Sequence, residues 1–250
     1  MSPRVLDEQS LLAREQMIIE AALNIIEREG VENFTMDKVV ASVPFSKGTV
    51  YKHFNGKEDV ILAINNQSLV ILCDFFARAA KYEGSPRERM LLVNFSYLMY
   101  SLLHPVLFTV ELCARSPSVL ERCAQTRIDT FEAKQTTLLL IIGGIIQEAV
   151  DKQHFKMPET MGVEQVCFSN WSMAYGIISL LSQQDEKCDV RAGLKVEREL
   201  FNNNNFLLDG MQWLPLSGDR DYKKEVVKAL ETIFPEELAK LAQAGLRLDL

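Results

Sequence analysis

The clearest chemical signal in this chain of 250 residues is a short basic stretch between Lys38 and Lys57. The stretch contains no acidic residue, but it holds four lysines and one histidine. Side chains of this kind bind phosphate groups, and such contacts act only locally because salt screens them beyond about 10 Å. Since the formal net charge of the whole chain is −7, the pattern indicates a protein that binds nucleic acid through one local surface.

Two short helices joined by a tight turn are predicted to position these side chains. Thr35 is a suitable N-cap for a helix that ends near Ser42, and Ser46 is a suitable N-cap for a second helix over residues 47–53. Together they have the size of a helix-turn-helix, in which the second helix enters the major groove of DNA.

The second helix is expected to have an inward and an outward face. Val50 and Phe54 are apolar and four residues apart, so they should pack inward. Gly48 removes a side chain near the helix start, which allows DNA to approach the backbone closely. The polar residues should face outward: Ser46, Lys47, Thr49, Tyr51, Lys52 and His53.

These side chains suit different parts of DNA. Lys47 can reach guanine O6 and N7, and Thr49 can contact a thymine methyl group or a phosphate. The residues after Val50 are better placed for phosphates, and the helix that begins at Lys57 adds backbone N–H donors. The predicted DNA contacts are Thr35, Lys38, Ser46, Lys47, Gly48, Thr49, Tyr51, Lys52, His53 and Lys57.

The remainder of the chain predicts an all-α fold, because apolar residues recur at spacings of three and four and no strand-like alternation runs far. The expected helices cover residues 8–28, 57–80, 86–103, 105–114, 117–123, 125–152, 163–184, 190–212, 219–233 and 235–246. The uncharged segment Met90–Val110 is long enough for a membrane span. Its polar residues and the His104-Pro105 break favour a buried, interrupted helix instead.

Composition predicts a soluble cytoplasmic protein without a metal or other cofactor. The N-terminal sequence MSPRVLDEQS lacks an apolar signal-peptide core. The cysteines are odd in number, widely spaced and without a metal-ligand pattern, which fits a reducing compartment. They are Cys73, Cys113, Cys123, Cys167 and Cys188.

The stretch FSKGTVYKHFNGKEDVILAI, with the preceding FTMDKV, resembles the TetR/AcrR family of one-component transcriptional regulators. The shared pattern is F-T-x-x-x-[VI], followed by S-K-G-T-[VL]-Y-x-[HY]-F-x-x-K-E-D. The resemblance is dense over residues 34–64 and only architectural beyond residue 85. It places Lys47, Gly48 and Thr49 at the base-reading start of the recognition helix, and it places Tyr51, Lys52 and His53 on phosphates. Lys57 matches the lysine that opens the fourth helix.

The resemblance also implies a domain organisation. Residues 1–56 would form a three-helix DNA-binding domain with the helix-turn-helix, and residues 57–213 a helical ligand-binding and dimerisation domain. Residues 214–250 form a helical extension beyond the family fold, expected to pack on the second domain. The homodimer would form through the helices near 163–184 and 190–212, as a four-helix interface.

One departure from the family concerns the turn between the two helices. The family usually has Ala-Gly-Val there, whereas this chain has Val43-Pro44-Phe45. Glycine commonly supplies a positive φ in such turns, and proline cannot. We therefore expect a differently built turn in which Val43 is extended, which leaves the angle between the helices and the half-site preference open.

Aromatic residues and methionines between 86 and 184 predict an apolar ligand cavity with a few polar groups. An acyl chain, an aromatic compound or a drug-like molecule would fit such a cavity. The run Asn202–Asn205 is expected to face solvent. The candidate ligand contacts are Asn94, Phe95, Met99, His104, Phe108, Glu111, Asn170, Trp171 and Tyr175.

These observations predict a sequence-specific DNA-binding transcriptional regulator. We expect a repressor that a small apolar or amphipathic ligand releases from a palindromic operator. An alternative is a helical protein-interaction module with weakened DNA binding, motivated by Pro44 and the acidic flanks of the basic stretch. An enzyme is disfavoured, because the sequence offers only His104 with Glu111 as an acid–base pair and no nucleophile, phosphate-loop or metal motif.

Overall fold

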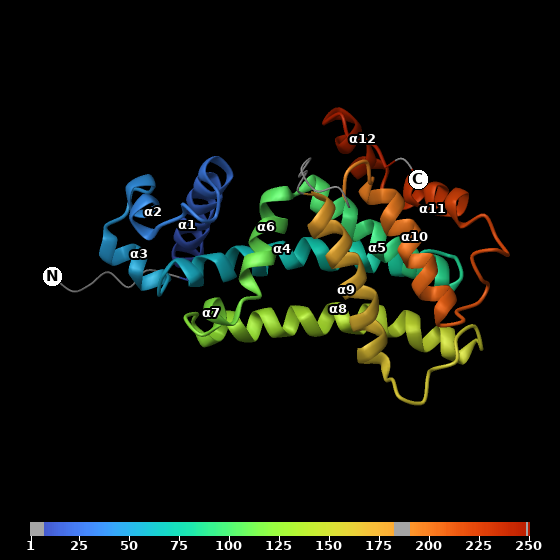
Figure 1. Cartoon of the computed structure of the whole chain (residues 1–250). Helices are drawn as coiled ribbons and strands as arrows, with labels where there is room; N and C mark the ends of the chain where they lie inside the picture. Colours follow the sequence, from blue (N-terminus) through green and yellow to red (C-terminus); the bar gives the residue numbers. More distant parts are fainter. Residues whose placement is uncertain (1–7, 183–190, 249) are drawn as a thin grey trace. The chain divides into compact units, whose positions relative to one another are not determined.

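The computed structural model describes residues 8–182, 191–248 and 250, and every regular element in these ranges is an α-helix, as predicted (Figure 1). Residue contacts divide the chain into two compact units. Unit 1 comprises Met1–Val70 and His104–Lys134, and unit 2 comprises Ile71–Leu103 and Gln135–Leu250. Helices α4 (Lys57–Ala80) and α8 (Gln125–Asp151) therefore contribute to both units. The boundaries at residues 56 and 213 stay predictions.

Unit 1 contains the predicted helix-turn-helix. Its helices are α1 (Glu8–Glu29), α2 (Met36–Ser42), α3 (Lys47–His53), α6 (Pro105–Ala114), α7 (Pro117–Leu120) and the adjoining parts of α4 and α8. Val50 and Phe54 are buried in its core, which confirms their predicted inward position. The same core contains apolar residues of α1, α2, α4 and α6, among them Ile18, Ile25, Val39, Ile64 and Val110.

Unit 2 is built around α5 (Pro86–Leu103), in which 15 of the 18 residues are buried. The helices that pack on α5 are α9 (Val163–Ser182), α10 (Val196–Gly210), α11 (Tyr222–Ile233) and α12 (Pro235–Gln243). The ends of two predicted helices, at residues 183–184 and 190, lie outside the described residues, as does Cys188.

The C-terminal helices α11 and α12 pack on α5, as predicted for the extension. Arg78 at the end of α4 fixes their connection. Its guanidinium donates to the carboxylate of Glu237 at 2.6 Å and to the backbone oxygen of Ile233 at 2.6 Å. It also lies 4.4 Å from the ring centre of Phe234, and that ring stacks on Phe75. The extension is thus a packed part of unit 2.

The prediction that Asn202–Asn205 faces solvent is wrong for its last two residues. Asn204 is fully buried and accepts a hydrogen bond from Asn94 of α5, which is also paired with Asn170 of α9. Asn205 is 6% exposed and accepts a hydrogen bond from Arg87. Buried polar groups need such partners, so these asparagines serve to join α10 to α5.

The segment Met90–Val110 is interrupted as predicted: α5 ends at Leu103, and Pro105 occupies the first turn of α6. Among the described residues, α4 is long and apolar enough to cross a membrane. However, 67% of its most apolar window is buried within the protein.

Candidate nucleic-acid interface

The turn between α2 and α3 is built as Pro44 requires. Val43 is extended, with φ −124° and ψ 152°, and this confirms the predicted effect of the following proline. Ser46 is also extended, and its hydroxyl accepts a hydrogen bond from the backbone N–H of Thr49 at 3.2 Å. The turn therefore ends at a capped helix start that is exposed to solvent.

The predicted caps are present at both helices. The Thr35 hydroxyl accepts a hydrogen bond from the backbone N–H of Lys38 at 3.4 Å, which caps α2. At α3, the hydroxyls of Ser46 and Thr49 also bond each other at 2.9 Å. Thr49 is thereby half-buried beside its cap, while Lys47 and Gly48 at the same end are exposed.

Two of the four lysines are paired with carboxylates of unit 1. Lys47 Nζ lies 2.9 Å from Asp37 Oδ1 and 5.7 Å from the ring centre of Tyr51. The hydrogen bond to Asp37, together with the charge of that carboxylate, raises the pKa of Lys47 above its ordinary value. Lys38 Nζ lies 2.6 Å from Glu29, and this hydrogen bond lowers the pKa of Glu29.

The other two lysines, Lys52 and Lys57, are exposed, and no carboxylate of the described residues lies within ion-pair distance of either. Tyr51 is 42% exposed beside them. Gly48 has open space around it, since a Cβ there would meet only the Ser46 hydroxyl at 4.0 Å. The protein's own packing therefore does not require glycine at this position.

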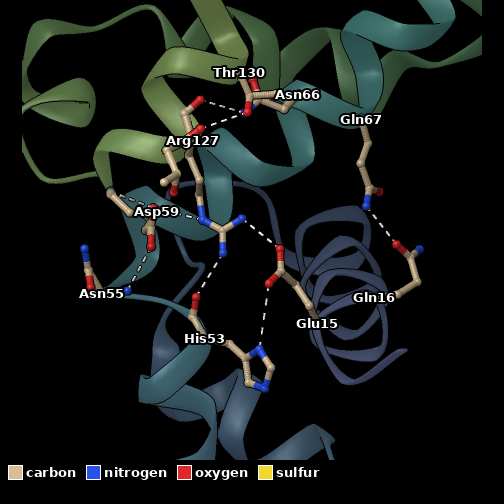
Figure 2. A network of polar contacts seen from close by, with 11 residues as sticks. Glu15, Gln16, His53, Asn55, Asp59, Asn66, Gln67, Arg127 and Thr130 are labelled. Atoms are coloured by element: carbon tan, nitrogen blue, oxygen red, sulfur yellow. Dashed lines mark hydrogen bonds and ion pairs between the residues drawn. The ribbon is translucent and has the colours of Figure 1, made fainter. Parts of the chain in front are cut away.

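His53 departs from its predicted outward position. Its side chain is only 10% exposed, and Nδ1 lies 3.7 Å from Glu15 Oε2 of α1 (Figure 2). The backbone oxygen of His53 accepts a hydrogen bond from Arg127 at 2.9 Å. Spacing along α3 placed His53 on the outer face, but the ring turns toward α1, which spacing within one helix does not reveal.

The predicted ligand contacts are divided between the two units. His104, Phe108 and Glu111 belong to unit 1, where Glu111 pairs with Arg115 at 2.9 Å. The other six belong to unit 2. There, Trp171 and Tyr175 have ring centres 5.2 Å apart and are half-buried. Their grouping in one cavity stays a prediction.

The amide pair Asn94 and Asn170 has a structural role in unit 2. Asn94 donates to Asn170 at 2.9 Å and receives a hydrogen bond from it at 3.1 Å. Because both side chains are at most 3% exposed and already partnered, they are less suited to hold a ligand than their polarity suggested.

Each unit also has grooves, and these are lined by residues other than the predicted ligand contacts. One of about 290 Å³ lies against α10 and the start of α11, and one of about 240 Å³ lies between α11 and α12. A third, of about 220 Å³, lies between the end of α1 and the start of α6 in unit 1. None of these three is lined by a predicted ligand contact.

Known proteins share the helix-turn-helix region. Residues 18–64 match the family described as bacterial regulatory proteins, tetR family. The HTH-type transcriptional regulator SrpR of Pseudomonas putida is 41% identical over 49 residues, which is 20% of this chain and 23% of that protein. The chain thus spans less than half the length of the curated relatives it matches.

Solved structures share the fold of most of the chain. The TetR family regulator PfmR from Thermus thermophilus is 18% identical with a TM-score of 0.53, covering 77% of this chain and 97% of that one. FadR from Bacillus subtilis, solved in complex with stearoyl-CoA, is 17% identical with a TM-score of 0.55, covering 78% and 96%. Residues 18–64 therefore match the helix-turn-helix segment of the tetR family of bacterial regulatory proteins, and most of the chain shares the helical fold of the solved structures.

Proposed function

We propose that this protein is a repressor that binds a palindromic operator through α3. The supporting observation is the division of α3 into a buried face, with Val50 in the core, and an exposed face that carries Lys47, Gly48 and Lys52. An exposed helix start without a side chain at its second residue suits insertion into the major groove. Lys52 and Lys57, which no carboxylate of the described residues pairs with, present positive charge beside it for phosphates.

The test begins with DNA fragments selected from a random pool by the purified protein. The double variant K47A/Y51A should abolish binding of the selected operator, because it removes the predicted base contact and a phosphate contact at once. The variant K81A removes one positive charge from exposed Lys81 in unit 2 and should bind as the parent does. Circular dichroism checks that the K47A/Y51A variant is folded. If the folded variant still binds the operator sequence-specifically, the proposal is contradicted.

The effector is proposed to be an apolar or amphipathic small molecule that weakens operator binding. This is supported by the partly buried rings of Trp171 and Tyr175 in unit 2 and by the stearoyl-CoA complex of the structurally similar FadR. The two recognition helices of the dimer must have the right spacing to bind the operator. A ligand that binds more tightly to the state with the wrong spacing lowers the affinity for DNA. Stearoyl-CoA should raise the melting temperature and lower operator affinity, with coenzyme A alone as the control.

The second candidate function is a helical interaction module with weakened DNA binding. The pairing of Lys38 with Glu29 and of Lys47 with Asp37 favours it, because these carboxylates reduce the positive charge of the basic stretch. Salt dependence separates the two functions. A DNA-binding regulator should lose affinity steeply between low and moderate salt, whereas an interaction module should bind DNA weakly at every salt concentration.

A further inference from the structure

Arg127, in the first turn of α8, joins three other helices of unit 1 through one guanidinium group (Figure 2). Nη1 donates to Glu15 of α1 at 2.8 Å. Nη2 donates to the backbone oxygen of His53, the last residue of α3, at 2.9 Å. Nε lies 3.1 Å from Asp59 Oδ1 of α4.

Asp59 also holds the connection between α3 and α4. This carboxylate is 1% exposed. It accepts the backbone N–H of Asn55 at 2.9 Å and the backbone N–H of Ala124, just before α8, at 3.0 Å. Asn66 of α4 completes the link by donating to the backbone oxygen of Arg127 at 2.9 Å. The start of α8 is thus fixed on the end of α3 and the start of α4.

Helix α3 is short, and few of its residues are buried. It has seven residues, and Val50 is the buried one among them. Its C-cap, Phe54, is buried as well, and the Arg127 guanidinium lies 4.4 Å from the centre of that ring. Hydrogen bonds from a planar, charged guanidinium are directional and stronger than neutral ones. The bond to the His53 carbonyl therefore constrains the direction of the α3 axis.

We infer that Arg127 is a positioning residue for the recognition helix: it sets the orientation in which α3 meets DNA and hence the half-site spacing that the dimer accepts. Arg127 itself is 16% exposed, with its guanidinium directed at groups of the protein. It acts through His53 and Phe54. The inference rests on the proposed DNA-binding function and adds a determinant of specificity outside the helix-turn-helix.

The test compares R127K with R122K. Lysine keeps the positive charge, but it cannot serve the carbonyl and both carboxylates in the fixed planar arrangement of a guanidinium. Arg122 pairs with Glu58 of α4 at 2.9 Å, and its side chain is 68% exposed. It therefore provides a matched control in the same segment of the chain. The DNA probes are the selected operator and two variants of it, one with the half-site spacing longer by one base pair and one with it shorter by one base pair.

For R127K we expect operator affinity to fall about tenfold, as for the loss of a charged hydrogen bond. The preference for native spacing should fall about threefold or more, while the slope of affinity against salt stays the same because the charge is kept. R122K should keep the spacing preference. A spacing preference that R127K retains in full, even with a lower melting temperature, would assign Arg127 a merely structural role and overturn the inference.

A second measurement needs no DNA. Hydrogen exchange on the full-length protein should become faster in R127K at residues 47–55 but not in α2, because the polar contacts of the Arg127 guanidinium are with α1, α3 and α4. Equal acceleration in α2 and α3, or none, would overturn the inference. If the parent protein selects no DNA sequence, the proposed function fails, and the exchange measurement still decides whether Arg127 holds α3.

Discussion

Asp37 and Lys47 form the ion pair closest to the predicted base-reading end of α3. Their side chains are 82% and 63% exposed, so solvent screens the pair strongly. The Asp37 carboxylate would have two effects on the proposed DNA binding: it holds Lys47 near Tyr51, and it places a negative charge where phosphates would approach. The positive charge that α3 presents is therefore smaller than its sequence suggests.

Replacing Asp37 with Asn should strengthen binding to DNA of random sequence by about three- to tenfold at low salt, because one repulsive charge is removed and Lys47 is released. Fluorescence anisotropy with a labelled random duplex measures this effect. The variant E236Q, which makes the same change of charge at an exposed site in unit 2, should have no such effect. Unchanged or weaker binding by D37N would contradict the role given to Asp37.

Single residues were predictable from the sequence where their partners are close along the chain. The caps Thr35 and Ser46 are confirmed, because a capping hydroxyl bonds an N–H only three residues away. Contacts between distant residues leave no such pattern. Arg127 was missed as a member of the site, since its partner Glu15 is 112 positions away in the sequence. The sequence does hold one signal: Arg127 lies in the first turn of a helix, where the helix dipole disfavours a positive charge.

At the level of helices, the buried amides of Asn94, Asn170 and Asn204 join α5, α9 and α10. Asn94 is central, because it hydrogen-bonds both of the others. The side chain of Asn204 also donates to the backbone oxygen of Leu200 within its own helix at 2.9 Å. A buried amide that loses its hydrogen-bond partner remains desolvated without compensation, and this lowers the stability of the folded protein.

The variant N94A should therefore lower the free energy of unfolding by about 2–4 kcal/mol, since Asn170 and Asn204 both lose a partner and a small void remains. Denaturation in urea, followed by circular dichroism, measures the change. N203A is the control: Asn203 is half-buried, and its amide bonds the Glu199 backbone oxygen of its own helix. A loss in N94A no larger than in N203A would show that the amide cluster adds little stability.

Helix positions were largely predictable, because caps, prolines and glycines mark their ends. The predicted starts at residues 86 and 105 agree with α5 and α6, each of which begins at a proline. The predicted helix over 190–212 is too long, as α10 covers only Val196–Gly210. Which helices pack against each other was harder to predict. The amides at 203–205 differ in burial because of how α10 lies on α5, and a run of identical residues gives no sign of that packing.

For the whole molecule, α9 and α10 expose large apolar side chains. Phe168 and Leu180 of α9 are 62% and 59% exposed, and Phe206 of α10 is 73% exposed. Large apolar side chains that are exposed on two adjacent helices suit a surface that another subunit covers. This supports the proposed homodimer through these two helices, with the same surface used by both protomers.

The variant F206E should shift the protein from dimer to monomer, because it places a charge in the proposed interface. Sedimentation velocity measures the mass, and operator binding should weaken strongly as paired half-site recognition is lost. L140E introduces the same charge at Leu140 of α8, which is 71% exposed and lies outside the two proposed helices. It should leave the dimer intact. A dimeric F206E, or a monomeric parent protein, would contradict this assembly.

The late position of α11 and α12 in the chain affects how the protein is made. These two helices cover α5, yet they leave the ribosome more than a hundred residues after it. At ordinary rates of translation, the nascent chain carries an uncovered α5 for roughly ten seconds. During that time its apolar residues, such as Leu91 and Phe95, are open to chaperones and to neighbouring nascent chains. Truncated products that end before residue 222 should therefore accumulate as aggregates.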